Sequence, residues 1–151
     1  FCKRFFDDAL TQIKKEYIDT GKAKLAYRHY PLPFHANAQK AAEASECANA
    51  QGAFWKYHDL LFQKQTEWEN QVAADAATSF SKYASEVGLN ASQFENCLSS
   101  SKFANVVKED NDSGQKAGVS GTPTLFVNGK AVVGAQPFAS FKTVIDEELK
   151  K

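Results

Sequence analysis

The chain begins with apolar residues at helical spacing. They are separated by three or four positions, so they share one face of a helix: Phe6, Leu10, Ile13 and Tyr17. We expect this helix over residues 2–20. Gly21 suits the position just past its end, where a positive φ is common.

Between residues 22 and 30 the spacing changes from helical to alternating. The residues that alternate with Lys24, Ala26 and Arg28 are Ala23, Leu25, Tyr27 and His29. This alternation predicts a strand, ended by Pro31 and Pro33 because proline lacks the backbone donor of a ladder. A helix that leads into a parallel strand is a crossover and requires an earlier strand. We therefore expect a strand upstream of Phe1 that this sequence does not include.

Residues 35–117 have a helical pattern throughout. The predicted helices cover 35–51, 54–66, 70–88, a segment opening at 90, and 103–116. Asn70 is a candidate N-cap for the third helix. The run Asn90-Ala-Ser-Gln93 resembles a capping box at the start of the fourth. This block lies between two predicted strand regions, so we interpret it as an all-helical insertion.

After the helical block comes a glycine-rich loop that leads into a hairpin. Pro123 precedes an apolar run, and Asn128-Gly129 is a strong signal for a two-residue hairpin turn. We expect strands directly after Pro123 and over residues 130–133, then a final helix starting at Pro137. The residues alone favour a trans bond before Pro123, because only about 5–6% of X-Pro bonds are cis.

Bulk composition narrows the function classes. The 151 residues suit one domain with a sizeable core, and 18 basic residues balance 18 acidic ones. Zero net charge argues against binding nucleic acid or anionic membranes as the main role. His29, His35 and His58 lack the spacing of known metal ligands, and no phosphate-binding loop is present. We expect no metal and no cofactor.

Cysteine usage carries more information than charge. Three cysteines leave one thiol free or paired with a residue outside this sequence. Cys47 and Cys97 either form a disulfide in an oxidising compartment or act as small buried apolar residues in a reducing one. Cys2 stands at the start of the first predicted helix, where the dipole stabilises a thiolate. The alternative is an inert cysteine.

Four blocks of sequence together resemble the DsbA-like thiol–disulfide oxidoreductases. These blocks are Phe1 to Phe6, Phe34 to Ala44, Gly121 to Thr124 and Gly134 to Phe138. The resemblance runs nearly end to end. It implies an α/β, thioredoxin-like fold with an inserted all-helical subdomain, whose first strands are missing from this chain. The core would comprise residues 1–34 and 118–151, and the insertion residues 35–117.

The resemblance also implies a site. Cys2 matches the second, resolving cysteine of a Cys-x-x-Cys motif, so the attacking cysteine would precede Phe1 as Cys-Pro-Phe-Cys. Thr122 and Pro123 match the cis-proline loop that faces the substrate in relatives. The expected catalytic set is Cys2, Thr122 and Pro123, and Cys47–Cys97 is expected to be a structural disulfide.

The expected function is disulfide formation or exchange in exported proteins, outside the cytoplasm in a periplasmic or cell-envelope setting. The partners would be cysteine-containing polypeptides and a redox partner, in relatives often a membrane quinone-linked protein. Two alternatives remain. A redox-inactive peptide-binding module would have serine or alanine three positions before Cys2. A glutathione-dependent enzyme would bind glutathione and would not need Cys2.

Overall fold

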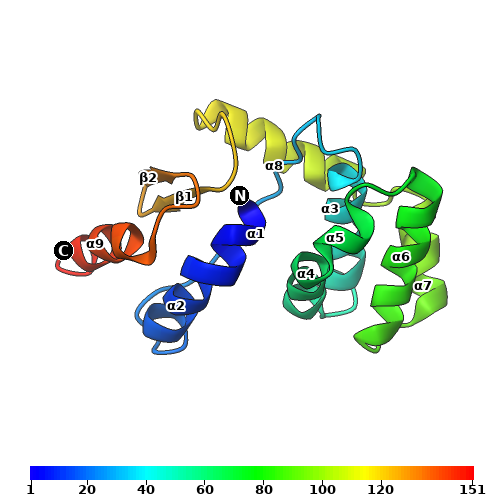
Figure 1. Cartoon of the computed structure of the whole chain (residues 1–151), viewed down its shortest axis with the longest axis horizontal. Helices are drawn as coiled ribbons and strands as arrows, with labels where there is room; N and C mark the ends of the chain where they lie inside the picture. Colours follow the sequence, from blue (N-terminus) through cyan, green and yellow to red (C-terminus); the bar gives the residue numbers. More distant parts are fainter. The chain divides into compact units, whose positions relative to one another are not determined.

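A computed structural model describes all residues, 1–151, and divides them into two compact units. The terminal unit comprises Phe1–Tyr27 and Gln115–Lys151, and the helical unit comprises Arg28–Gly114. Figure 1 gives the order and labels of the elements in each. No helix is both long enough and apolar enough to cross a membrane.

The terminal unit begins with one continuous helical run. It consists of α1 (Cys2–Phe5), η1 (Phe6–Leu10), α2 (Thr11–Ile13) and η2 (Lys14–Ile18), and the two η segments have the wider π-helical winding. Asp19 closes the run by donating its N–H to the Lys14 carbonyl at 2.8 Å. Gly21 then adopts a φ of +73°. The helix predicted from the apolar spacing is confirmed.

The second half of this unit is a hairpin followed by a helix, drawn in orange and red in Figure 1. Strands β1 (Thr124–Val127) and β2 (Lys130–Val133) pair antiparallel, with Thr124 opposite Val133. Asn128 and Gly129 both have positive φ, 47° and 88°, as the predicted turn requires. Helix α9 (Phe138–Glu148) follows, with Pro137 at its N-cap.

The core of the terminal unit lies between the first helical run and α9. Its buried members are Ala9, Ile13, Tyr17, Phe141 and Ile145. The Phe5 and Phe141 rings are 5.3 Å apart between centroids. Leu125, Val127 and Val132 pack against this cluster from one face of the hairpin.

The strand predicted over residues 22–30 is wrong for this structure. The only sheet is the hairpin β1–β2, and residues 23–30 are extended without a ladder. Ala23 still packs on the terminal core, and His29 is 4% exposed. The His29 N–H is satisfied by the Asp110 carboxylate at 3.0 Å instead of by another strand. Of the alternating residues, Leu25 is half-buried but Tyr27 is 40% exposed, and no strand lies alongside to complete a sheet.

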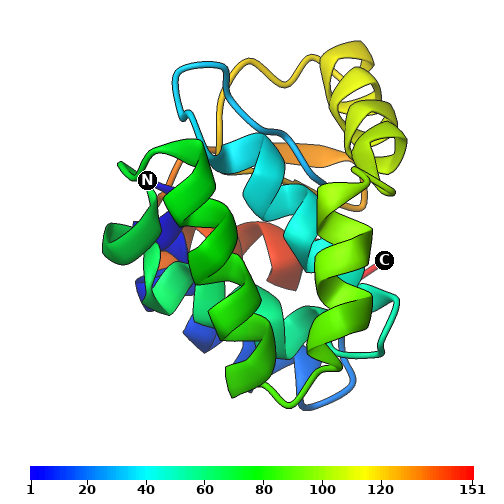
Figure 2. The same cartoon turned by 90° about the vertical axis from the view of Figure 1, so that its right-hand side faces the viewer.

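The helical unit contains α3 (Ala38–Asn49), α4 (Phe54–Gln63), α5 (Gln65–Trp68), α6 (Ala73–Glu86), α7 (Ala91–Ser99) and most of α8 (Ala104–Lys116). Figure 2 shows the cyan and green helices α3 to α7 gathered in one bundle. Their shared core is Ala41, Ala44, Cys47, Ala48, Tyr57, Leu61, Ala76, Phe80, Tyr83, Ala84, Phe94 and Leu98.

The two predicted caps in this unit had different outcomes. Asn90 caps α7, because its Oδ1 accepts the Gln93 N–H at 2.9 Å. The reciprocal bond is made by Gln51, whose Oε1 accepts the Asn90 N–H at 2.9 Å. Asn70 does not cap α6: Val72 occupies the N-cap position, and no side chain caps that end. The prediction for Asn70 was wrong because α6 starts later than its polar neighbourhood suggests.

Candidate active site

Cys2 is the only free cysteine and is half-buried. It is the first residue of the helical run, and no side chain caps that end. The first turn contains no acidic residue, while Lys3 and Arg4 supply positive charge. A helix N-terminus favours an anion, because its unpaired N–H groups and dipole present positive charge. The Cys2 side chain therefore stands at a helix end that presents positive charge.

Arg4 connects this first turn to the loop that follows the hairpin. Its Nη2 donates to the Ala135 carbonyl at 3.0 Å, across 131 positions of sequence. The guanidinium also lies over the Phe1 ring, 5.1 Å from its centroid. Lys3 instead pairs with Asp7 at 2.9 Å. The helix that bears Cys2 is thus tied directly to the segment beyond β2.

The Pro123 loop enters the hairpin with a cis bond between Thr122 and Pro123. Pro123 is buried and Thr122 is half-buried. The loop is braced on both sides: Gly134 donates its N–H to the Pro123 carbonyl at 2.8 Å, and the Thr124 hydroxyl donates to the Gly121 carbonyl at 2.8 Å. The backbone of Thr122 makes no hydrogen bond within the protein.

A groove of about 940 Å³ runs beside the first helical turns. One wall is formed by the helix and the other by residues 134–138. Three aromatic residues and a proline give it an apolar lining: Phe1, Phe5, Pro137 and Phe138. Arg4, Asp7 and Asp8 add charge to it. Spacing alone did not reveal this groove, because its second wall comes from the other end of the chain.

Tyr27 is a neighbour of Cys2 that the sequence pattern did not single out. It keeps 40% of its surface exposed. Partial burial raises the pKa of Tyr27, and Cys2 would raise it further when its thiol is ionised. The only available signal was its place in the alternating segment that follows the first helix.

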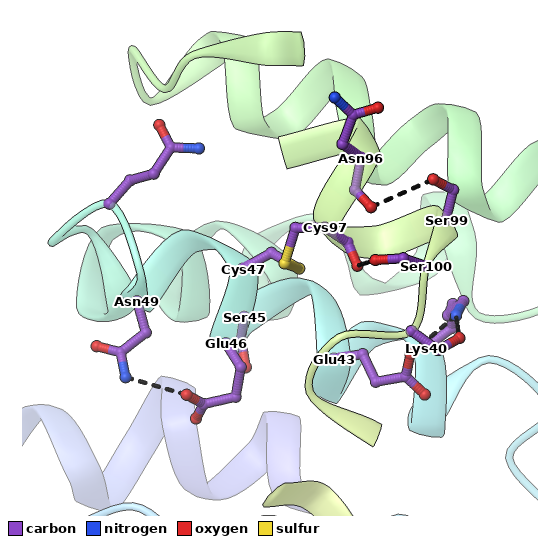
Figure 3. The surroundings of a disulfide bond; sticks show 12 residues. Lys40, Glu43, Ser45, Glu46, Cys47, Asn49, Asn96, Cys97, Ser99 and Ser100 are labelled. Carbon is purple, nitrogen blue, oxygen red and sulfur yellow. Dashed lines mark hydrogen bonds and ion pairs between the residues drawn. A yellow bond between two sulfur atoms is a disulfide. The ribbon is translucent and has the colours of Figure 1, made fainter. Parts of the chain in front are cut away.

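Cys47 and Cys97 form a disulfide in the helical unit, as expected (Figure 3). Cys47 lies on α3 and is 1% exposed, whereas Cys97 on α7 is half-buried. Polar contacts surround the bond: Lys40 pairs with Glu43 at 2.8 Å, and the Ser100 hydroxyl donates to the Cys97 carbonyl at 3.1 Å. The disulfide belongs to the helical unit, whereas Cys2, Thr122 and Pro123 belong to the terminal unit.

Two of the three histidines are held by carboxylates within the helical unit. His29 Nε2 lies 2.8 Å from Glu46 Oε1, and His58 Nδ1 lies 2.8 Å from Asp59 Oδ1. The His58 ring also contacts the rings of Phe54, Trp55 and Phe62, with centroids 5.0–5.8 Å apart. The His35 ring lies 4.6 Å from the Phe34 ring between centroids, with the ring planes tilted by 57°. These contacts account for the histidines as structural groups.

Comparisons with known proteins agree along the whole chain. The family model described as Thioredoxin matches residues 1–147. Disulfide bond formation protein D of Bacillus subtilis is 31% identical over 157 residues, which covers 99% of this chain and 67% of that protein. A segment of the Na(+)/H(+) antiporter NhaA 3 of Salinispora tropica is 38% identical over 119 residues, covering 78% of this chain and 17% of the antiporter. The chain thus spans about two thirds of the first relative and under a fifth of the second.

Solved structures give the same result. The oxidised crystal structure of BdbD from Bacillus subtilis matches 99% of this chain and 81% of its own, with a TM-score of 0.88 and 29% identity. The structure of alpha-DsbA1 from Wolbachia pipientis matches 99% of this chain and 79% of its own, with a TM-score of 0.83 and 25% identity.

Proposed function

Because this chain belongs to the DsbA-like thiol–disulfide oxidoreductases of the thioredoxin family, we propose that it forms or exchanges disulfides in exported polypeptides. The observation that supports this proposal most directly is that Cys2 is a free thiol at a helix N-terminus. It is the one thiol outside the disulfide, and it stands at an uncapped helix N-terminus with two cations in the first turn. Such a position favours the thiolate, which is the nucleophile in disulfide exchange.

Cys2 takes the role of the resolving cysteine in this proposal. The attacking cysteine is proposed to lie three positions before Cys2, ahead of Phe1. To oxidise a substrate, one substrate thiolate attacks the upstream cysteine of the motif disulfide, which forms a mixed disulfide and releases Cys2 as a thiolate. A second substrate thiolate then attacks the substrate sulfur of the mixed disulfide, so the substrate disulfide closes, both motif cysteines are left reduced, and two electrons later pass to a separate redox partner. In the opposite direction the upstream thiolate opens a substrate disulfide, and Cys2 resolves the mixed disulfide by closing the motif and releasing the substrate as a thiolate.

Thr122 and Pro123 are proposed to hold the substrate. The unused N–H and C=O of Thr122 are available to pair with an extended polypeptide, which is a form of strand addition. The loop is braced because the Pro123 carbonyl accepts the Gly134 N–H and the Thr124 hydroxyl donates to the Gly121 carbonyl. The backbone of a bound substrate would therefore pair with a loop whose position is fixed by these hydrogen bonds.

The proposed setting is extracytoplasmic, in the periplasm or cell envelope. It is supported by the disulfide Cys47–Cys97, because such bonds persist in oxidising compartments. The redox partner that reoxidises the motif is proposed to be a membrane quinone-linked protein. Turnover requires such a partner because the polypeptide substrate leaves the motif reduced.

The test is to express the protein from its complete reading frame and measure its reduction potential against glutathione. Exchange with a reduced, unfolded polypeptide is measured in parallel. We expect a potential above that of structural disulfides, which lie below about −300 mV, and exchange that Cys2→Ser abolishes. A potential in the structural range without exchange would contradict the proposal and favour a redox-inactive binding module. Exchange that needs glutathione but not Cys2 would favour the glutathione-dependent alternative.

A further inference from the structure

Arg4 makes a contact that its place in the helix does not predict. A basic residue of a helix usually pairs with an acid three or four positions away, as Lys3 does with Asp7 at 2.9 Å. Asp8 stands four positions after Arg4, but no ion pair joins the two. Arg4 instead donates from Nη2 to the Ala135 carbonyl at 3.0 Å. Its side chain therefore binds a distant segment of the chain and not its own helix.

The Ala135 carbonyl belongs to a tight turn that is itself bonded to the Pro123 loop. Gln136 closes this turn, because its N–H donates to the Gly134 carbonyl at 2.9 Å and its Nε2 donates to the Val133 carbonyl at 3.0 Å. Gly134 has a φ of +85°, which glycine adopts without steric cost. The Gly134 N–H donates to the Pro123 carbonyl at 2.8 Å. A short, internally bonded turn therefore joins the carbonyl that the helix holds to the Pro123 loop.

The Arg4 side chain is held in place without belonging to the core. Its guanidinium lies over the Phe1 ring, 5.1 Å from the centroid, and this contact favours one orientation of the planar group. Arg4 itself is exposed. The core contact of the same helical turn is made by Phe5, whose ring packs against Phe141 of α9. Loss of the arginine therefore removes the bond to the turn and leaves the buried cluster intact.

We propose that Arg4 is a positioning residue for disulfide exchange with polypeptides. It acts through Ala135 and Pro123, because two hydrogen bonds in series connect the helical turn that begins at Cys2 to the backbone next to Thr122. This inference rests on the proposed function, in which Thr122 pairs with the substrate backbone and the sulfur chemistry takes place at the Cys2 motif. Without the arginine the loop samples more positions, so a bound polypeptide less often brings its sulfur to the motif in a reactive geometry.

The test compares Arg4→Met with Lys3→Met in the protein expressed from its complete reading frame. Both changes remove one positive charge from the first helical turn, but only Arg4→Met removes a bond to the turn at Ala135. The oxidised proteins react separately with a reduced, unfolded polypeptide and with dithiothreitol. Each reagent is oxidised to its disulfide while the motif is reduced to two thiols. Dithiothreitol does not need to pair with Thr122, so its rate reports the reactivity of the motif alone.

The two reagents should separate positioning from charge. We expect Arg4→Met to lower the polypeptide rate about two- to ten-fold more than Lys3→Met does, which is the range for loss of one hydrogen bond. The dithiothreitol rates of the two variants should be equal. An equal loss of polypeptide rate in both variants, or an extra loss of the same size with dithiothreitol, would overturn the inference while leaving the proposed function intact.

Hydrogen exchange of the Gly134 amide tests the structural link directly. This N–H is bonded to the Pro123 carbonyl, so a looser turn should expose it to solvent more often. We expect faster exchange of this amide in Arg4→Met and parent-like exchange in Lys3→Met. An unchanged Gly134 amide in Arg4→Met would also overturn the inference. Failure of the parent protein to oxidise either reagent would instead contradict the proposed function.

Discussion

The two units of this protein differ in what they contribute. The helical unit has the larger core, and its buried polar groups are fully bonded: Tyr57, for example, donates to the Phe80 carbonyl at 2.8 Å. The terminal unit has a smaller buried cluster and a two-stranded hairpin, yet it contains Cys2, Thr122, Pro123 and the groove. Structural stability and reactive groups are therefore concentrated in different parts of one chain.

Asn37 illustrates how the helical unit secures itself. Its side chain is 4% exposed, and its amide nitrogen donates to the carbonyls of Trp68 and Gln71, each at 2.9 Å. A buried amide that satisfies several carbonyls fixes the loop between α5 and α6. The terminal unit has no comparable buried amide near Cys2, where the contacts are exposed charges and a groove open to solvent.

The largest expected effect separates chemistry from stability. Cys2→Ser should abolish net disulfide exchange, because Cys2 is the proposed resolving thiol and the motif disulfide cannot close without it. Its free energy of unfolding should stay within about 0.5 kcal/mol of the parent, since the exchanged atom is small and half-buried. Thiol-exchange kinetics measure the loss of exchange, and urea unfolding measures the free energy of unfolding. Residual exchange in this variant would show that a sulfur other than that of Cys2 takes part. The reactive groups would then not be confined to the terminal unit.

The converse change removes the disulfide of the helical unit. Cys47→Ala with Cys97→Ala opens a loop spanning 50 positions, which the chain-entropy model values at about 4 kcal/mol. Both tryptophans, Trp55 and Trp68, lie in this unit, so tryptophan fluorescence reports its unfolding. We expect a much lower urea midpoint and an unchanged rate of Cys2 exchange per folded molecule. An altered exchange rate would show that the two units are coupled.

The terminal unit contains a hydrogen bond between Tyr17 and Asp146 whose contribution to stability should depend on pH. The Tyr17 hydroxyl donates to Asp146 at 2.6 Å, and Lys142 lies 2.9 Å from the same carboxylate. These two contacts, that of Tyr17 first, lower the pKa of Asp146. A carboxyl with a lowered folded pKa stabilises the protein above its unfolded value, near pH 4, and this contribution is lost as pH falls through the folded pKa.

Tyr17→Phe should cost about 1–2 kcal/mol at pH 7, because it removes a hydrogen bond to a charged acceptor. The difference between the variant and the parent should shrink below pH 4. Hydrogen exchange of the α9 amides localises the effect to the terminal unit. Thr143→Val is a control on α9, since its hydroxyl bonds only to the Ala139 carbonyl of the same helix. A cost that stayed constant down to pH 2 would contradict the role given to Asp146.

The sequence predicted elements well where local signals decide them. Asn128-Gly129 produced the expected turn, and the apolar spacing located the first helix, because both depend on neighbouring residues. The expected strand over 22–30 failed because alternation of side chains does not show whether another backbone lies alongside. The groove and the Arg4–Ala135 bond depend on segments more than 100 residues apart, so no local pattern announces them.

The candidate site was only partly readable for the same reason. Cys2 and Pro123 stood out by residue type and by resemblance to a known family. Tyr27 did not, because its electrostatic relation to Cys2 joins residues 25 positions apart and no local pattern predicts it.

The smallest expected effect tests whether the helical unit depends on its local caps. Asn90→Ala removes the side-chain acceptor of the Gln93 N–H at the start of α7, and loss of an N-cap costs about 1 kcal/mol. Asn90→Asp should restore most of this, because it keeps an acceptor and adds a charge favourable to the dipole. Asn96→Ala, an exposed position within the same helix, should be neutral or slightly stabilising. Helix α7 also carries Cys97, so the size of the loss in the free energy of unfolding has a structural meaning. A loss well above about 1 kcal/mol in Asn90→Ala would mean that the disulfide depends on the cap. No loss would mean that the disulfide alone holds the start of the helix.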